Sequence, residues 1–145
     1  MVRVVLAIAA LSLAATAVLA QSDPIKTRQD LMKANDKNYK TLKAIVRGQA
    51  RYDQAKVDQA FAQWGETAQK FGSLFPDNSK TGQDTTASAK IWQNRADFDA
   101  KLAAFGKAVA DNRDKAKSLN DLKPGFTAVD KACGDCHELY RVRKR

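Results

Sequence analysis

Residues 126–141 read FTAVDKACGDCHELYR, and this stretch decides the fold. Apolar side chains recur in it at steps of three and four residues, which is the spacing of one side of an α-helix. The pattern extends from about residue 120 to residue 143, with Asn120 as the expected cap and Pro124 in the first turn. The positions expected on the buried side are Leu122, Phe126, Val129, Ala132, Cys133, Cys136, Leu139 and Tyr140.

Three further amphipathic segments precede this helix. Their expected bounds are 24–47, 53–72 and 88–117. Asp23 and Asp53 are natural N-caps, and Gly48 is a natural C-terminal stop. A loop rich in turn residues, at 74–86, separates the second and third segments. No segment alternates with a period of two, so the sequence predicts an all-α fold, an antiparallel four-helix bundle.

Residues 133–137 form a Cys-X-X-Cys-His motif, the attachment signature of c-type haem. On a helix, residues three apart share one side, so both thiols can reach the two vinyl groups along one porphyrin edge. His137 follows directly, and its imidazole can turn under the ring to bind the iron. The sequence therefore predicts one covalent haem c attached to Cys133 and Cys136.

Other uses of two cysteines fit this sequence less well. A thioredoxin-like dithiol opens a helix that follows a strand, whereas this motif lies near the end of the last helix. A structural zinc site needs four ligands, and the chain offers two cysteines and one histidine. A disulfide would leave the adjacent His137 unexplained. A dithiol or metal protein without haem stays open as an alternative, which a colourless purified protein would favour.

The N-terminus has the features of an export signal. Arg3 precedes an apolar run that reaches residue 17, and Val18-Leu19-Ala20 offers the small residues that a signal peptidase reads. We therefore predict a cleaved signal peptide at 1–20, a mature domain at 21–145 and a periplasmic location. The run is short for a spanning helix, so an uncleaved anchor is the weaker alternative, and the mature form is expected to bind no membrane.

The chain is strongly basic. It contains 25 Lys and Arg residues against 16 Asp and Glu residues, for a formal net charge of +9 at pH 7. In an exported haem protein, such a charge favours brief, salt-sensitive docking to acidic redox partner proteins. Nucleic acid is not an expected partner, because export separates the protein from it.

The motif and three other segments resemble the class II c-type cytochromes, the cytochrome c′ family. Residues 136–141, CHELYR, resemble the family's Cys-His-X-X-Tyr/Phe-Arg ending. Arg28-Gln29 resembles the family's early Arg-Gln pair. Residues 48–53, GQARYD, resemble its first inter-helix turn, and Ile91-Trp92 resembles the start of its third helix. The resemblance covers essentially all of the predicted mature chain, and it implies a four-helix bundle with one haem near the C-terminus.

The resemblance also implies roles for individual residues. His137 would be the proximal axial ligand of the iron. Arg28 and Gln29 would lie near the haem propionates, and a guanidinium suits a carboxylate; the alternative is a solvent-facing pair in the first turns of the helix. Arg141, one turn after His137, would line the proximal pocket or complement the helix dipole.

The identity of the sixth ligand divides the possible functions. Family members with an open distal side bind small gases such as nitric oxide or carbon monoxide, whereas members with a methionine there transfer electrons. Met32 is the one methionine outside the predicted signal peptide, and His137 is the only histidine. Met32 falls at the family's distal position, and a thioether suits haem iron. We therefore predict His137/Met32 ligation and a cytochrome c-556-like electron carrier.

Other outcomes stay open at this point. Met32 would fill the bundle core, as methionine often does, if the haem were five-coordinate and bound gases. A lysine or water is a further candidate for the sixth ligand. No second histidine or acid–base group has a position in the sequence that would place it over the iron, so no enzymatic activity is expected. Both a monomer and a homodimer fit the sequence.

Overall fold

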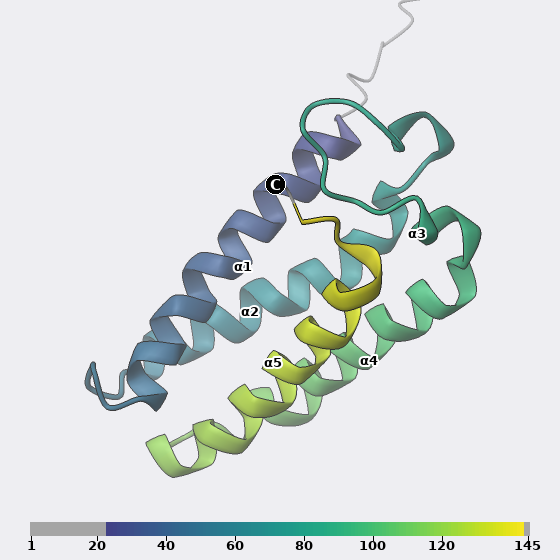
Figure 1. Ribbon diagram of the computed structural model, residues 1–145. Coiled ribbons are helices and arrows are strands. Elements are labelled where there is room, and N and C mark those ends of the chain that lie inside the picture. Colours follow the sequence, from purple (N-terminus) through teal and green to yellow (C-terminus); the bar gives the residue numbers. More distant parts are fainter. Residues whose placement is uncertain (1–22, 144–145) are drawn as a thin grey trace, which may run out of the picture.

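The computed structural model describes residues 23–143. Four long helices pack as an antiparallel bundle, and a loop with a short helix covers one end (Figure 1). The long helices are α1 (Pro24–Val46), α2 (Gln54–Lys70), α4 (Arg95–Arg113) and α5 (Leu119–Tyr140). The shorter elements are α3 (Lys90–Gln93) and the 3-10 turns η1 (Phe71–Leu74) and η2 (Asp77–Ser79). The predicted all-α bundle is confirmed, while the predicted signal peptide lies outside the described residues.

Side-chain caps fix where the first two helices begin. Asp23 Oδ1 accepts a hydrogen bond from the backbone N–H of Ile25 at 2.9 Å, and Asp53 Oδ1 accepts one from that of Lys56 at 3.2 Å. After α1 the chain turns at Gly48, whose φ of +72° lies in the left-handed region that favours glycine. Both helices are therefore capped by the residues that the sequence predicts. No helix between residues 23 and 143 combines the length and apolar character needed to cross a membrane.

The prediction of one continuous helix at 88–117 is wrong. It is divided into α3 and α4 at Asn94, whose φ of −131° and ψ of 59° are not helical. The indole N–H of Trp92 donates to the backbone oxygen of Phe75 at 3.0 Å, which holds α3 against the preceding loop. The backbone oxygen of Asn94 then accepts a hydrogen bond from the N–H of Phe98 at 3.1 Å as α4 begins. Contacts with a distant segment thus interrupt a pattern that is locally helical.

Helix α5 begins earlier than predicted. Ser118 caps it in place of Asn120, because the Ser118 hydroxyl accepts a hydrogen bond from the N–H of Asp121 at 3.3 Å. Pro124 consequently lies inside the helix, beyond the first turn in which it was expected. A proline there removes one helical hydrogen bond, which the packing of the rest of α5 must offset.

The C-terminal end of α5 also differs from the prediction. The helix ends at Tyr140 and not at residue 143, because Arg141 is extended and pairs with Ala87 in an isolated antiparallel bridge. Leu139, expected on the buried side, is 41% exposed, whereas Tyr140 is 5% exposed. Adjacent helical residues point about 100° apart, so these two side chains do not both face the core.

The core is divided into two clusters along the bundle. The larger cluster joins all four long helices and contains the buried residues Leu42, Ile45, Val57, Ala60, Phe61, Trp64, Phe105, Val109, Ala116, Leu122, Phe126 and Val129. The smaller cluster lies at the loop end and contains Phe75, Ile91, Phe98 and Tyr140. Cys133 packs against the larger cluster and Cys136 against the smaller one. The two cysteines of the motif therefore lie at the boundary between the clusters.

Candidate haem-binding site

One stripe of α5 faces α1 and carries part of the motif. Its members, at steps of four, three and four residues, are Phe126, Asp130, Cys133 and His137. This spacing puts them on one side of the helix. The ring of Tyr39 on α1 stacks on Phe126 with 5.2 Å between ring centroids. Burial raises the pKa of Tyr39, and the nearby Asp130 carboxylate and Cys133 thiol raise it further, so the stripe faces α1 as far as Cys133.

The same contact fixes the level of Met32. Helices α1 and α5 run in opposite directions (Figure 1). Met32 precedes Tyr39 by seven residues, about two turns, and Cys133 follows Phe126 by the same interval. Two turns from the Tyr39–Phe126 contact, in the same direction along the bundle, therefore lead to Met32 on α1 and to Cys133 on α5, and His137 follows one turn further. Met32 and the haem motif thus lie toward the same end of two neighbouring helices.

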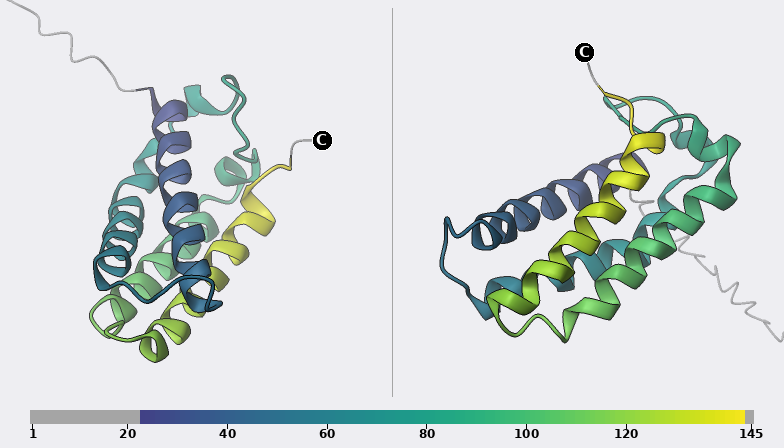
Figure 2. Two further views of the ribbon diagram at one scale, coloured as in Figure 1. Left: turned by 90° about the vertical axis from the view of Figure 1, so that its left-hand side faces the viewer. Right: turned by 60° about the horizontal axis from the view of Figure 1, so that its bottom comes forward.

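Met32 is not part of the packed core. It is half-buried, and among the described residues neither core cluster includes it or has it packed alongside. Figure 2 (left) shows α1 and α5 diverging toward the N-terminal end of α1 and the C-terminal end of α5. The packing of Met32 therefore does not favour its alternative role as a core filler.

A hollow of about 900 Å³ lies beside His137, a volume in the range of cofactor and ligand pockets. Its walls come from α5, the loop before α3 and the residues after α5: Thr86, Gly134, His137, Glu138, Arg141, Val142 and Arg143. Desolvation lowers the pKa of His137, and the charge of Arg141 lowers it further. Both effects favour the neutral imidazole, the form that ligates metal ions. Of the two expected roles of Arg141, the hollow supports the lining of a pocket beside His137.

Both cysteines are free and half-buried. Burial raises the pKa of Cys133 to about 11, and it raises the pKa of Cys136 as well. A redox-active dithiol needs a lowered thiol pKa, so this environment argues against the dithiol alternative. Within residues 23–143, no group of three or more Cys, His, Asp and Glu side chains is arranged to hold a metal ion. Two protonated thiols beside a neutral imidazole fit the vinyl edge and the iron of a covalent haem.

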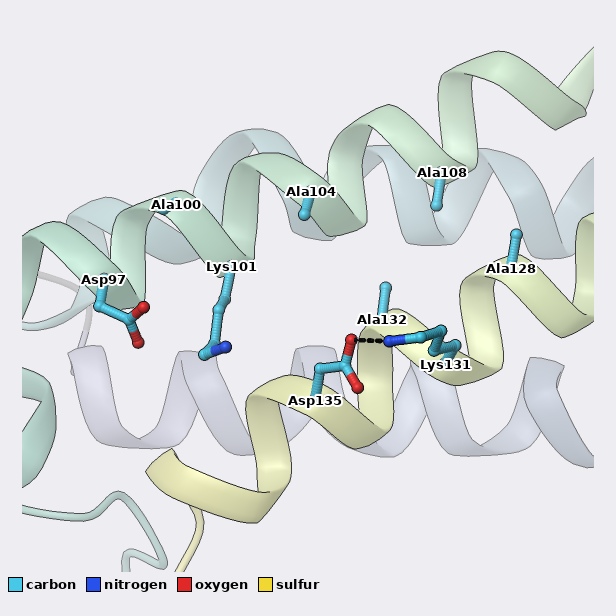
Figure 3. Close-up of a pocket in the computed structure, with 9 residues that line it drawn as sticks. All are labelled: Asp97, Ala100, Lys101, Ala104, Ala108, Ala128, Lys131, Ala132 and Asp135. Atoms are coloured by element: carbon cyan, nitrogen blue, oxygen red, sulfur yellow. Dashed lines mark hydrogen bonds and ion pairs between the residues drawn. The ribbon is translucent and has the colours of Figure 1, made fainter.

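A second hollow, of about 330 Å³, runs between α4 and α5 (Figure 3). Its walls carry the small side chains of Ala100, Ala104, Ala108, Ala128 and Ala132. Four charged residues complete the lining, and two of them, Lys131 and Asp135, form an ion pair with 2.5 Å between Nζ and Oδ2. The lining includes no imidazole, thiol or thioether, so this hollow is not a candidate haem site.

Arg28 and Gln29 both contact the long loop. The Arg28 side chain is buried at 4% exposure and donates four hydrogen bonds to oxygens of Leu74, Ser79 and Thr85. Gln29 Nε2 donates to the backbone oxygen of Gln83 at 2.7 Å. The alternative of a solvent-facing pair is therefore wrong for Arg28. Contact of the pair with haem propionates stays a prediction.

Sequence reasoning missed the contact that fixes the end of the motif helix. The hydroxyl of the buried Tyr140 donates to Asp97 Oδ2 at 2.6 Å, and its ring meets Phe98 edge-on with 5.3 Å between centroids. These contacts join the end of α5 to the start of α4, next to Cys136. The sequence offered Tyr140 as an apolar position, but it gave no sign that Asp97 would accept its hydrogen bond.

Known proteins match the chain over most of its length. The family model described as Cytochrome C′ matches residues 23–141. The chain is 43% identical to the cytochrome c-556 of Rhodopseudomonas palustris, in an alignment that covers 99% of each chain.

Solved structures from the same organism match the bundle. Its cytochrome c′ superposes with a TM-score of 0.81 at 34% identity, and an NMR-validated structural model for its oxidized cytochrome c556 does so with a TM-score of 0.78 at 41% identity. Each match covers 86% of this chain and 100% of the other.

Proposed function

Because this chain belongs to the cytochrome c′ family, whose members carry covalent haem c, we propose that it is a periplasmic electron carrier with His137 and Met32 as axial ligands. The observation that carries the proposal is the register of α1 and α5. The contact of Tyr39 with Phe126 supports it, because about two turns further along the bundle Met32 lies on α1 and the motif that ends in His137 begins on α5. An iron between these helices would have one ligand from each.

Cys133 and Cys136 are the proposed attachment points of the haem. Both cysteines are half-buried, and they pack against different core clusters, so a haem joined to both would be held by residues beside each cluster. When bound, the haem supplies an iron that alternates between the ferrous and ferric states. The axial pair and the burial of the site would set its reduction potential. We propose no substrate chemistry.

The relatives support a methionine-ligated member. The chain is 43% identical to cytochrome c-556 of Rhodopseudomonas palustris and 34% identical to the cytochrome c′ of the same organism. The half-buried thioether of Met32, outside both core clusters, is consistent with that choice.

A gas-binding haem with an open sixth position is the second candidate. The fold agrees with the cytochrome c′ of Rhodopseudomonas palustris at a TM-score of 0.81 and with its cytochrome c556 at 0.78, so the backbone favours neither function. The coordination of Met32 is the difference between the two candidates.

Export to the periplasm is part of the proposal. The family match begins at residue 23, shortly after the predicted cleavage site at Ala20. The solved cytochrome c556 is covered completely by 86% of this chain. Both observations support a leader at 1–20 that precedes the haem domain.

The proposed partners are acidic redox proteins that dock transiently. Arg141 and Arg143 are exposed and line the hollow beside His137. Positive charge close to the iron ligand would guide an acidic partner toward the haem and would act less as salt increases.

The visible spectrum of the holoprotein, with and without carbon monoxide, tests the proposed function. We expect low-spin bands, a sulfur-to-iron charge-transfer band in the ferric form, and slow carbon monoxide binding by the ferrous form. The Met32→Leu variant, which keeps a side chain of similar volume, should lose the charge-transfer band and bind carbon monoxide at once. High-spin bands and prompt binding by the unaltered protein would instead support the gas-binding candidate.

A further inference from the structure

The guanidinium of Arg28 holds the bridging loop, defined here as residues 74–88, against α1. Its Nη1 donates to the backbone oxygen of Leu74 at 2.6 Å and to Ser79 Oγ at 2.9 Å. Its Nη2 donates to the backbone oxygen of Ser79 at 2.9 Å and to Thr85 Oγ1 at 3.4 Å. The Cζ atom also lies 4.5 Å from the centre of the Phe75 ring. One side chain of α1 therefore contacts both halves of the loop.

Neighbouring residues of α1 strengthen this attachment. Gln29 Nε2 donates to the backbone oxygen of Gln83 at 2.7 Å. The side chain of Gln83 in turn donates to the second carboxylate oxygen of Asp23, whose first oxygen caps α1. The first two turns of α1 and the bridging loop thus form one hydrogen-bonded unit.

The other end of the bridging loop is joined to the chain after α5. The N–H of Ser88 donates to the backbone oxygen of Tyr140 at 2.9 Å, and the N–H of Val142 donates to that of Thr86 at 2.8 Å. These two bonds flank the bridge between Ala87 and Arg141. The loop is therefore bonded to α1 along much of its length and to the end of α5 at residues 86–88.

Both attachments lie about one turn from a predicted axial ligand. Arg28 is four residues before Met32 on α1, and Tyr140 is three residues after His137 on α5. We propose that Arg28 is a positioning residue, which fixes through the bridging loop the spacing between the segments of α1 and α5 that carry Met32 and His137. This deepens the proposed function, because the sulfur of Met32 can bind the iron only while α1 is held close to it.

The forked geometry of the guanidinium is the property that this role requires. A lysine keeps the charge but presents a single ammonium group, which cannot reach the separate oxygens of Leu74, Ser79 and Thr85 together. Arg28→Lys and Arg28→Gln should therefore have similar effects. A role that depends only on the positive charge, for example toward a haem propionate, would be largely retained by lysine.

The test uses the haem-loaded protein and changes each partner of the contact between Arg28 and the bridging loop in turn. Arg28→Lys and Arg28→Gln change the donor, and Ser79→Ala/Thr85→Val removes two acceptors while leaving α1 and its charge intact. All three variants should weaken the sulfur-to-iron charge-transfer band and speed carbon monoxide binding by about tenfold, the factor that ~1.4 kcal/mol represents. Amide hydrogen exchange in residues 79–88 and 140–142 should also become faster.

Two control variants separate positioning from general effects. Arg47→Gln removes one positive charge at the opposite end of α1, and Val57→Ala weakens the larger core cluster. Neither should change the charge-transfer band or the carbon monoxide rate. Wild-type behaviour of the loop variant, or recovery of wild-type behaviour by lysine at position 28, would overturn the proposal.

The hydrogen-exchange readout keeps this proposal distinct from the proposed function. If the unaltered protein is high-spin, methionine ligation fails, and the spacing role is decided by exchange alone. Faster exchange at both loop attachments in the Arg28 variants then supports the role of Arg28. Unchanged exchange at residues 140–142 contradicts it, whatever the coordination of the iron.

Discussion

Tyr140 is the last residue of α5 and joins that helix to α4. Its hydrogen bond to Asp97 is the main reason that the pKa of the phenol rises to about 12, and burial adds to the effect. The neighbouring Cys136 thiol contributes in the same direction. The folded protein thus favours the neutral phenol at a place that borders the haem attachment site.

This environment predicts a loss of stability at alkaline pH. The pKa of Tyr140 is higher in the folded chain than the value of about 10 in an unfolded one, so its contribution is complete below pH ~10. The contribution should disappear as the pH rises from about 10 to about 12. Urea unfolding between pH 9 and 12 should therefore show a smaller pH dependence for Tyr140→Phe than for the unaltered protein. Parallel curves for the two proteins would contradict the assignment.

Local sequence reveals a residue's role when the chemistry is local. Cys133, Cys136 and His137 could be recognised because covalent haem attachment requires them within five consecutive residues. The partners of Arg28 and Tyr140 could not, because Ser79 and Asp97 approach them only after the helices pack. The level of Met32 relative to His137 likewise depends on the register of two helices far apart in the sequence.

The pairing of α4 with α5 depends on a close approach at one glycine. A Cβ atom at Gly125 would lie 2.9 Å from the Cβ of Asn112 on α4. The side chain of Asn112 has little freedom to move, because its Nδ2 donates to the backbone oxygen of Ala108 at 2.8 Å. The glycine therefore determines how closely these two helices pack.

Two glycine substitutions with opposite expected effects test this packing. Gly125→Ala should lower the free energy of unfolding by about 1–2 kcal/mol, because the clash outweighs the better helix propensity of alanine. Gly65→Ala is the matched control, since its nearest neighbour, a Val109 methyl group, is 4.0 Å away. That variant should gain up to about 1 kcal/mol. Denaturant unfolding of both variants measures the difference, and equal effects of the same sign would contradict it.

At the scale of elements, caps and periodicity predicted the helices better than their interruptions. Asp23 and Asp53 begin α1 and α2 as expected, because a cap acts within one turn of the chain. The break at Asn94 could not be predicted, since the apolar pattern continues on both sides and the interruption depends on the Trp92 contact with Phe75. The choice of Ser118 over Asn120 as the cap of α5 was equally ambiguous, because both residue types are good N-caps.

The charge of the whole molecule affects association more than stability. Many of its ion pairs, such as Lys26–Asp30 and Lys107–Asp111, join exposed residues one turn apart on a helix. Such exposed pairs contribute little to stability, because water and salt screen the attraction. The net charge of +9 is instead a long-range property, which acts on partners before contact.

Oxidation of the ferrous protein by ferricyanide, a small anion, should reveal where that charge acts. The double variant Arg141→Gln/Arg143→Gln should react about two- to threefold more slowly at low ionic strength, because it removes attraction beside the haem site. Arg47→Gln, at the far end of α1, should have a smaller effect. The difference should vanish near 0.5 M salt, where charges are screened within about 5 Å. A difference that persists in high salt would show that the two arginines act by another route.

The division of the core at Cys133 and Cys136 also bears on how the protein is assembled. Local opening is easiest where few buried apolar contacts are lost, and the smaller cluster at the loop end holds fewer such residues than the larger one. A chain that has not yet received its haem can therefore open that end while the rest of the bundle remains folded. Opening would expose the Cys136 thiol, which packs against the smaller cluster. Attachment of the haem would then stabilise the loop end of the bundle, which is the part held by the smaller core cluster.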